Sequence, residues 1–271
     1  LGYMYSEGGT SQHLYTFTNS DPIIVDSMKN SCLLLGGELN PKRLHGNIIP
    51  SCYYITSLRH IGKDFKLDGC LATTKKIHPD IFKWDKDSIR TFLKALFGGD
   101  GHFGYRKLIR KNGSITSHCK IVYSSSSKQL ATDVRDLLMK FGLISKLDKI
   151  FVKYKGGKRL SWQVKLSDIA QVRSFVEQIG YYGVKQNFAE TCLSLMKNVS
   201  PNRNKDLVPK DVWKIIKQKF VLQNKSYKSY GKARKNGLVE KLAKIYKSPN
   251  RDSLLCLAKF LDNDSQLLNL A

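Results

Sequence analysis

Two short segments of the sequence align with each other, and each ends in an acidic residue followed by glycine. Residues 3–8 read YMYSEG and residues 96–101 read LFGGDG, so Glu7 stands at the position of Asp100. A single acidic residue of this kind is usually a solvated cap, but two at matching positions of a repeat form a pair. Two carboxylates brought together suit a hard divalent cation, and without a metal they repel and take up a proton. The pair predicts a metal site.

Small residues precede both acidic ends at matching positions, Gly2 in the first segment and Ala95 in the second. Small side chains let two helices approach closely, because the distance between helix axes depends on the side chains at the contact. We therefore expect the two segments to be paired helices that bring Glu7 and Asp100 together at their shared ends.

The second segment belongs to a regular unit. Its helix can be capped by Asp85 or Asp87, and its apolar residues recur at a spacing of three to four. Turn and stop signals follow in the Asn-Gly pair at 112–113, the Gly-Gly pair at 156–157, Gly142 and Gly180. The predicted order is helix, hairpin, helix, hairpin, helix.

The first segment opens a less regular copy of this order. A β-prone stretch precedes Asp21-Pro22, which starts a helix that ends at Gly36-Gly37. Strand-like residues and a short helix ending near Gly62 follow. The repeat of about 90 residues predicts two similar half-domains, residues 1–91 and 92–199. Residues 200–271 are helical by pattern and predict a C-terminal extension.

The charge of the chain is strongly positive and unevenly distributed. Lys and Arg number 46 against 22 Asp and Glu, a formal net charge of +24. Residues 1–91 contribute +2, residues 92–199 contribute +12 and residues 200–271 contribute +10. With 41% hydrophobic and 10% aromatic residues the chain is folded rather than a disordered basic tail. Nucleic acid is the expected partner.

The six cysteines form no CxxC pair and do not indicate a zinc site or a disulfide framework. No stretch approaches the roughly 18 apolar residues of a membrane span, and no signal peptide is evident. We expect an intracellular, cytoplasmic protein without a membrane partner.

The motif segments resemble those of the LAGLIDADG homing endonucleases of the DOD type. The second copy, FLKALFGGDGHF, matches well, and the first, LGYMYSEGG, ends in Glu instead of Asp. TTKKIHPDIF at 73–82 is similar to the family's Lys-x-Ile-Pro segment with one residue inserted before Pro79. YSSSSKQLATDVRDLLMKFGL is similar to the helix after a half-domain's first hairpin.

The end of the chain, DSQLLNLA, resembles the segment that precedes the resumed splicing domain in archaeal-type inteins. The resemblance implies the endonuclease domain of an intein. Intein splicing needs Cys or Ser at the start and Asn at the end, so with Leu1 and Ala271 we expect no splicing from this chain as it stands.

The resemblance implies an α+β fold of two pseudo-symmetric αββαββα half-domains, whose antiparallel sheets form a saddle over the DNA major groove. Glu7 and Asp100 carry over as catalytic metal ligands for Mg²⁺. Mn²⁺ is expected to substitute, and Ca²⁺ to bind without supporting cleavage. The family's basic residue near each active centre falls on Lys75, or on Lys76 because of the shifted proline, and on Lys185.

DNA contacts are expected from one exposed face of the strands, by Arg to bases and Lys mainly to phosphates. The candidates in the first half are Gln12, His13 and Arg43. In the second half they are Tyr105, Arg106, Lys107, Arg110, Lys120, Lys153, Lys155, Lys158, Arg159 and Lys165. In the extension they are Lys228, Lys232, Arg234 and Lys235.

The function implied is that of a monomeric, site-specific double-strand DNA endonuclease with a long asymmetric target and no obligate protein partner. The alternative is a non-cleaving nucleic-acid-binding protein of the same fold, such as an RNA maturase or a degenerate endonuclease. The uneven charge further predicts that the second half and the extension hold most phosphates, while the first half relies on neutral polar contacts.

Overall fold

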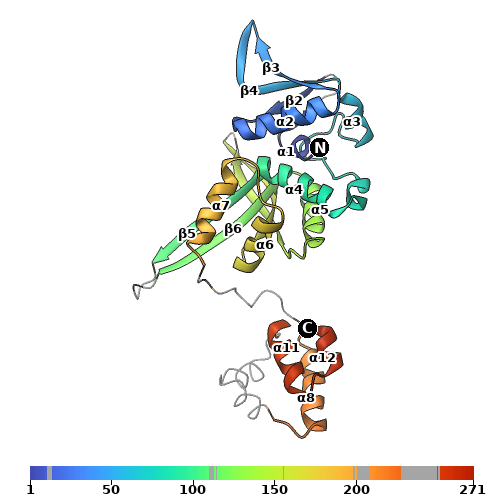
Figure 1. The fold of residues 1–271 in the computed structure, drawn as a ribbon, viewed down its shortest axis with the longest axis vertical. Coiled ribbons are helices and arrows are strands. Elements are labelled where there is room, and N and C mark those ends of the chain that lie inside the picture. Colours follow the sequence, from blue (N-terminus) through green and yellow to red (C-terminus); the bar gives the residue numbers. More distant parts are fainter. Residues whose placement is uncertain are drawn as a thin grey trace. The chain divides into compact units, whose positions relative to one another are not determined.

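The computed structural model describes residues 1–10, 14–109, 113, 115–154, 156–197, 199, 208–226, 249 and 251–271. The chain divides into two compact units, Leu1–Ser200 and Pro201–Ala271, which are described separately. Figure 1 shows the order of the elements along the chain.

The first half of the larger unit is built around one antiparallel sheet. Its elements are α1 (Gly2–Ser6), β1 (Gly8–Thr10), β2 (Tyr15–Thr18), α2 (Pro22–Leu34), β3 (Glu38–Leu44), β4 (Asn47–Thr56) and α3 (Arg59–Asp64). The strand order is β1-β2-β4-β3. Asp21 caps α2 as predicted, because its side chain accepts from the amide of Ile23.

A short 3-10 helix, η1 (Pro79–Lys83), leads into the second half. Its elements are α4 (Lys86–Asp100), β5 (Gly101–Ile109), β6 (Ile115–Ser125), α5 (Lys128–Met139), β7 (Lys146–Tyr154), β8 (Gly157–Leu166), α6 (Ile169–Gln178) and α7 (Val184–Ser194). The strand order β5-β6-β8-β7 repeats that of the first sheet. The expected boundary between residues 91 and 92 lies inside α4, and α7 was not predicted.

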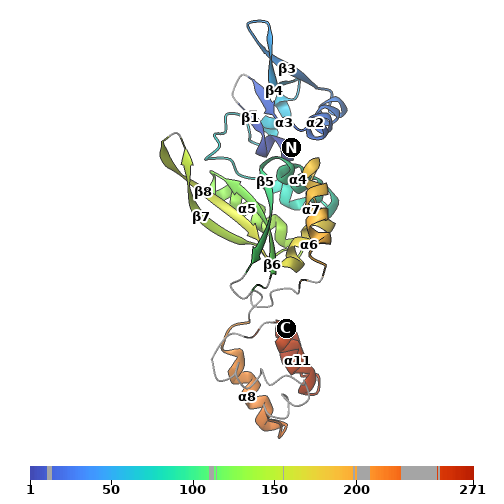
Figure 2. The ribbon, with the colours of Figure 1, turned by 90° about the vertical axis from the view of Figure 1, so that its left-hand side faces the viewer.

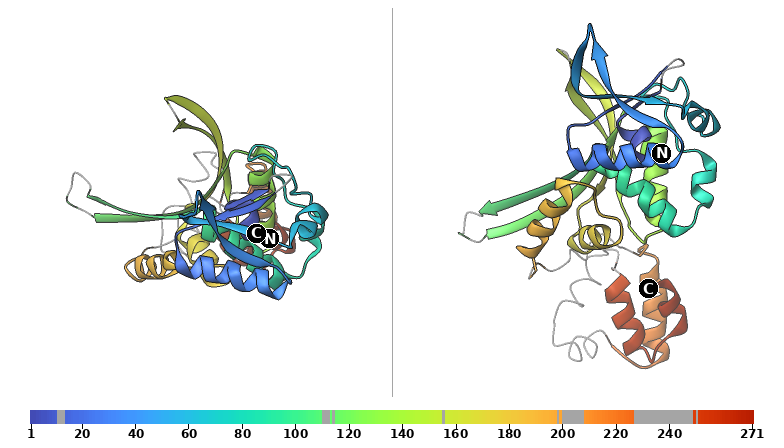
Figure 3. Two further views of the ribbon diagram at one scale, coloured as in Figure 1. Left: turned by 90° about the horizontal axis from the view of Figure 1, so that it is seen from above. Right: turned by 45° about the horizontal axis from the view of Figure 1, so that its top comes forward.

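The predicted α+β fold class with two αββαββα halves is confirmed. Figure 2 shows α2, α4, α6 and α7 along the same side of the strands. Seen from above, the β5–β6 and β7–β8 hairpins extend beyond the helices (Figure 3). One apolar core joins both halves, with Phe17 from the first sheet and Phe97, Tyr123 and Phe175 from the second half all fully buried.

The smaller unit is helical where it is described. It contains α8 (Val212–Leu222), α11 (Arg251–Phe260) and α12 (Ser265–Leu270). Ile216, Leu254, Leu261 and Leu267 have no exposed surface and form its core. The C-terminal helical extension is therefore confirmed for these segments, whereas the helix expected at 238–246 lies outside the described residues.

Candidate active site

Helices α1 and α4 pack against each other through residues that lack large side chains. A Cβ built on Gly2 would collide with the carbonyl oxygen of Phe92 and lie 2.8 Å from the Cβ of Ala95. At the other end of the contact, a Cβ on Gly99 would collide with the hydroxyl of Ser6 and lie 2.8 Å from the Cγ of Glu7. The predicted close approach of the two segments is confirmed, and it places the ends of both helices side by side.

The two acidic residues lie at these adjoining ends. Glu7 is the C-terminal cap of α1 and is half-buried, and Asn19 donates from its Nδ2 to Glu7 Oε1 at 3.4 Å. Asp100 is the last residue of α4 and its side chain remains exposed. Nothing in the sequence singles out Asn19, which lies two residues before the cap of α2.

The pair perturbs its own titration. The pKa of Asp100 is raised to about 7, first because the surrounding protein displaces much of the water around this exposed carboxylate and then because Glu7 repels its charge. Burial also raises the pKa of Glu7. Lys75 and Lys185 oppose both shifts. In the absence of a cation, the site therefore retains a proton close to neutral pH.

Each helix end is bound by one lysine. The ammonium of Lys75 donates to the carbonyl oxygens of Met4 (3.1 Å), Tyr5 (3.2 Å) and Gly8 (2.9 Å). The ammonium of Lys185 donates to those of Gly98 (2.5 Å), Gly99 (2.7 Å) and Gly101 (2.9 Å). The last carbonyls of a helix have no partner within it, so a cation there is stabilising.

Burial distinguishes the first lysine from its neighbour. Lys75 is only 7% exposed, whereas Lys76 is exposed and has no such contact with α1. Lys185 is half-buried at the start of α7. Burial lowers the pKa of Lys75 and of Lys185, while the nearby carboxylates of Glu7 and Asp100 raise it. Four predicted site residues thus lie together: Glu7, Asp100, Lys75 and Lys185.

The donor set fits a hard divalent cation. Within the part of the chain that the structure describes, no group of three or more His, Cys, Asp or Glu side chains could hold a metal. Two carboxylates are nevertheless what Mg²⁺ commonly uses in proteins, with water and substrate phosphates completing its shell. The raised pKa of Asp100 beside Glu7 is the expected signature of two such oxygens waiting for a counter-charge.

Strand register divides the DNA-contact candidates of the second half between two faces. Cys119, Ile121 and Tyr123 on β6 are buried toward the helices, so the alternate residue Lys120 points to the other face, which we call the open face. Pairing places on the open face Arg106, Lys120, Arg159 and Lys165, and on the helix-side face Tyr105, Lys107, Lys153 and Lys158.

The expectation that all these candidates share one face is therefore wrong, because neighbours along a strand point in opposite directions. Lys165 is also ion-paired with Asp148 at 3.2 Å. In the first half, Arg43 is exposed on β3. The remaining candidates, Gln12, His13, Arg110, Lys155, Lys228, Lys232, Arg234 and Lys235, lie outside the described residues.

Two further observations concern cysteines and membrane spans. All six cysteines are within the described ranges and are free thiols, three of them buried. In the same ranges, no helix combines the length and the apolar character that a membrane span requires.

Curated proteins similar to this chain are much longer than it is. The replicative DNA helicase DnaB of Rhodothermus marinus is 30% identical over 226 residues, which cover 79% of this chain and 23% of that protein. The GyrA-type subunit of the DNA gyrase of Mycolicibacterium flavescens is 27% identical over 218 residues, 77% of this chain and 36% of that protein. The chain thus spans about a quarter and about a third of their lengths.

Among solved structures, the LAGLIDADG homing endonuclease I-SmaMI bound to cleaved DNA is 13% identical. The alignment covers 73% of this chain and 88% of that chain, with a TM-score of 0.43. The family model of the LAGLIDADG-like domain matches residues 87–180, which take in α4 almost entirely and run through α6. The resemblance noted in FLKALFGGDGHF is thereby confirmed: Asp100 lies within a segment that matches the LAGLIDADG-like domain.

Proposed function

We propose that this chain is a site-specific double-strand DNA endonuclease, the homing endonuclease part of an intein, which acts as a monomer with Mg²⁺. The observation that carries the proposal is the pairing of α1 and α4. Their adjoining ends present Glu7 and Asp100, and each end is bound by one buried or half-buried lysine. A single chain holds both halves of this centre, so no second copy is needed to complete it.

The carboxylates of Glu7 and Asp100 would hold the cation together with water and DNA phosphate oxygens. When bound, Mg²⁺ supplies Lewis-acid activation of water and stabilisation of the leaving oxygen in phosphodiester hydrolysis. Asp100 must lose its proton to act as a ligand, and the charges of Lys75 and Lys185 favour that loss.

The two lysines act chiefly through their charge. An ammonium has three N–H groups, and each lysine directs its three toward three carbonyl oxygens. The positive charge is thus fixed in place before DNA arrives, and it can offset negative charge that develops on the reacting phosphate without moving.

The curated relatives support the intein context. A DNA helicase and a DNA gyrase are unrelated proteins, yet each contains one segment similar to this chain. A segment that recurs inside unrelated and much longer proteins behaves as an insertion. The natural target of such an insertion is the uninterrupted coding sequence into which it moves.

The test is cleavage of a panel of duplexes. It contains the sequence that joins the two flanks of this chain's own coding segment, and uninterrupted coding sequences of the helicase DnaB and of DNA gyrase. The wild-type protein should cut one of them in Mg²⁺. Asp100→Asn and Glu7→Gln should abolish cutting and leave DNA binding within about threefold, because they remove cation ligands and not the contact surface.

The competing function has a distinct outcome. Tight, salt-sensitive binding of DNA or RNA without cleavage in Mg²⁺ or Mn²⁺ would identify a non-cleaving nucleic-acid-binding protein. Full activity of Asp100→Asn would overturn the assignment of that carboxylate.

A further inference from the structure

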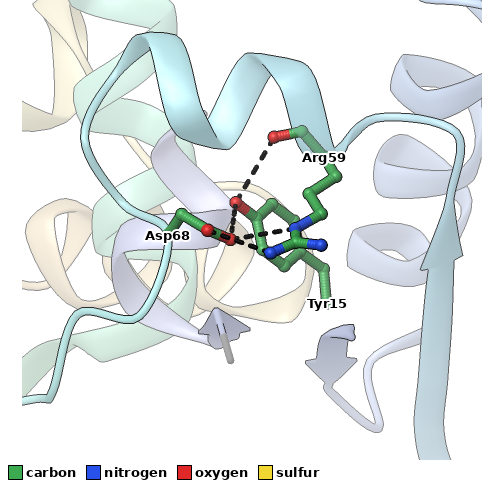
Figure 4. Close-up of polar contacts among 3 residues, drawn as sticks. All are labelled: Tyr15, Arg59 and Asp68. Atoms are coloured by element: carbon green, nitrogen blue, oxygen red, sulfur yellow. Dashed lines mark hydrogen bonds and ion pairs between the residues drawn. The ribbon is translucent and has the colours of Figure 1, made fainter. Parts of the chain in front are cut away.

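The segment that carries Lys75 connects the two halves and is anchored to the first half at its beginning. The hydroxyl of Tyr15 donates to Asp68 Oδ1 at 2.9 Å, and the guanidinium of Arg59 pairs with the same carboxylate at 3.2 Å (Figure 4). The next residue, Gly69, donates its amide to the carbonyl of Thr10 at 2.6 Å. Residues 68 and 69 are therefore fixed on the first sheet.

The second half holds the same segment at Lys75 itself. Ser127 caps α5 by accepting from the amide of Leu130 at 3.1 Å, and its hydroxyl donates to the main-chain carbonyl of Lys75 at 2.6 Å. Asp133, one turn further along α5, accepts from the amide of Ile77 at 2.9 Å. Ser127 is 2% exposed and Asp133 is 7% exposed, so water does not replace these bonds readily.

The first half holds the segment that carries Lys185 in a related way. Asp21 caps α2 through its Oδ1, and its Oδ2 accepts from the amide of Val184 at 3.2 Å. A Cβ on Gly183 would collide with that carboxylate, so the glycine permits the contact. Val184 starts α7 and directly precedes Lys185.

The two contacts correspond to each other under the repeat. Helices α2 and α5 occupy the same place in their halves, and in each the cap residue at the start of the helix bonds to the main chain beside the lysine of the opposite centre. We propose that Ser127 and Asp21 are reciprocal positioning residues: each half fixes the lysine that serves the other half's motif helix.

This inference rests on the proposed function, because its readout is strand cleavage. If each lysine serves one strand, Ser127→Ala should slow cutting of one strand by about tenfold and of the other by less than about twofold. Asp21→Asn should slow the opposite strand. The Asn variant keeps an oxygen for the cap and turns an N–H group toward either Ile23 or Val184, which breaks one of the two bonds.

The experiment uses the duplex that the wild-type protein cuts, labelled on one strand or the other, under single-turnover conditions in Mg²⁺. Lys75→Met and Lys185→Met assign a strand to each lysine, and Ser127→Ala should share the bias of the first. Ser127→Thr keeps the hydroxyl and should restore balanced cutting. Asp85→Ala removes the cap of α4, whose contacts are all local, and should cause no bias.

The outcomes separate cleanly. If a lysine variant does not fold, opposite biases of Ser127→Ala and Asp21→Asn still support the inference. Equal slowing of both strands, or no slowing, in folded Ser127 and Asp21 variants of an enzyme that cuts would overturn the inference and leave the proposed function standing. A wild-type protein that cuts nothing defeats both.

Discussion

The Cα of Gly2 rests against α4, at a place where a Cβ would strike the carbonyl of Phe92 and come within 2.8 Å of the Cβ of Ala95. Gly2→Ala should therefore force α1 and α4 apart and destabilise the protein by about 1–3 kcal/mol, the usual cost of overpacking. Because the acidic ends separate with the helices, DNA cleavage should fall as well. Urea unfolding and the cleavage rate measure the two effects.

Gly98→Ala is the matched control on α4. The nearest atoms to a Cβ there lie 3.7–3.8 Å away, which is ordinary contact, and alanine is the better helix former by roughly 0.5–1 kcal/mol. This variant should be as stable as the wild type or more so. A neutral Gly2→Ala beside a damaging Gly98→Ala would contradict the observed packing.

Local signals were sufficient to predict most elements of this fold. Asp85 caps α4, and the left-handed backbone of Gly142 and Gly156, with φ of 69° and 78°, ends a helix and turns a hairpin as expected. Helix α7 was missed because its start has no local side-chain cap. Its partner is Asp21, which is far away in the sequence, and no local pattern reveals that contact.

The pKa of Asp100 predicts a pH-dependent stability of the metal-free protein. Its pKa is raised from 3.8 to about 7, so the folded state binds this proton more tightly than the unfolded state does. The contribution of Asp100 to the free energy of unfolding should therefore fall between about pH 4 and pH 7 and stay low above pH 7. In EDTA at pH 8, Asp100→Asn should be more stable than wild type by about 1 kcal/mol, a figure reduced for the solvent that reaches this side chain.

The same pair of proteins tests the cation. Mg²⁺ added at pH 8 should raise the melting temperature of the wild type, because a ligand that binds only the folded state stabilises it. It should leave Asp100→Asn nearly unchanged. An unchanged difference between the two proteins from pH 5 to pH 8 would show that Asp100 has an ordinary pKa.

The candidate site was predictable only where the repeat itself marks the residues. Glu7 and Asp100 fall at matching positions, so alignment of the sequence with itself identifies them. Lys75 and Lys76 are consecutive, and only burial against α1 distinguishes them. The DNA-facing set depends on strand register, because a shift of one residue exchanges the two faces, and composition does not specify register.

The open face of the second sheet predicts which basic residues bind DNA. Arg106 and Lys120 lie on it, while Lys107 and Lys153 lie on the helix-side face. The double variant Arg106→Gln/Lys120→Gln should weaken binding and reduce the slope of log K against log salt by about 2, because each substitution removes one charged group that binds a phosphate. Lys107→Gln/Lys153→Gln removes the same charge and should change the slope by less than about 1. Equal slopes would show that the two faces are not distinguished by DNA.

The two halves should also differ in how they hold DNA. On the first sheet, register places Thr16, Thr18 and Tyr54 away from the buried Phe17 and Tyr15, so this open face is mainly neutral, and Lys42 lies over the Tyr54 ring at 5.6 Å. Hydroxyl contacts release no counterions, whereas lysine and arginine contacts with phosphate do. Lys42→Gln/Arg43→Gln should therefore lower the salt slope less than Arg106→Gln/Lys120→Gln does, measured on one duplex from about 50 to 200 mM salt. Because the two variants lose the same formal charge, a difference between them reports phosphate binding and not net charge, and equal slopes would contradict the division of duties between the halves.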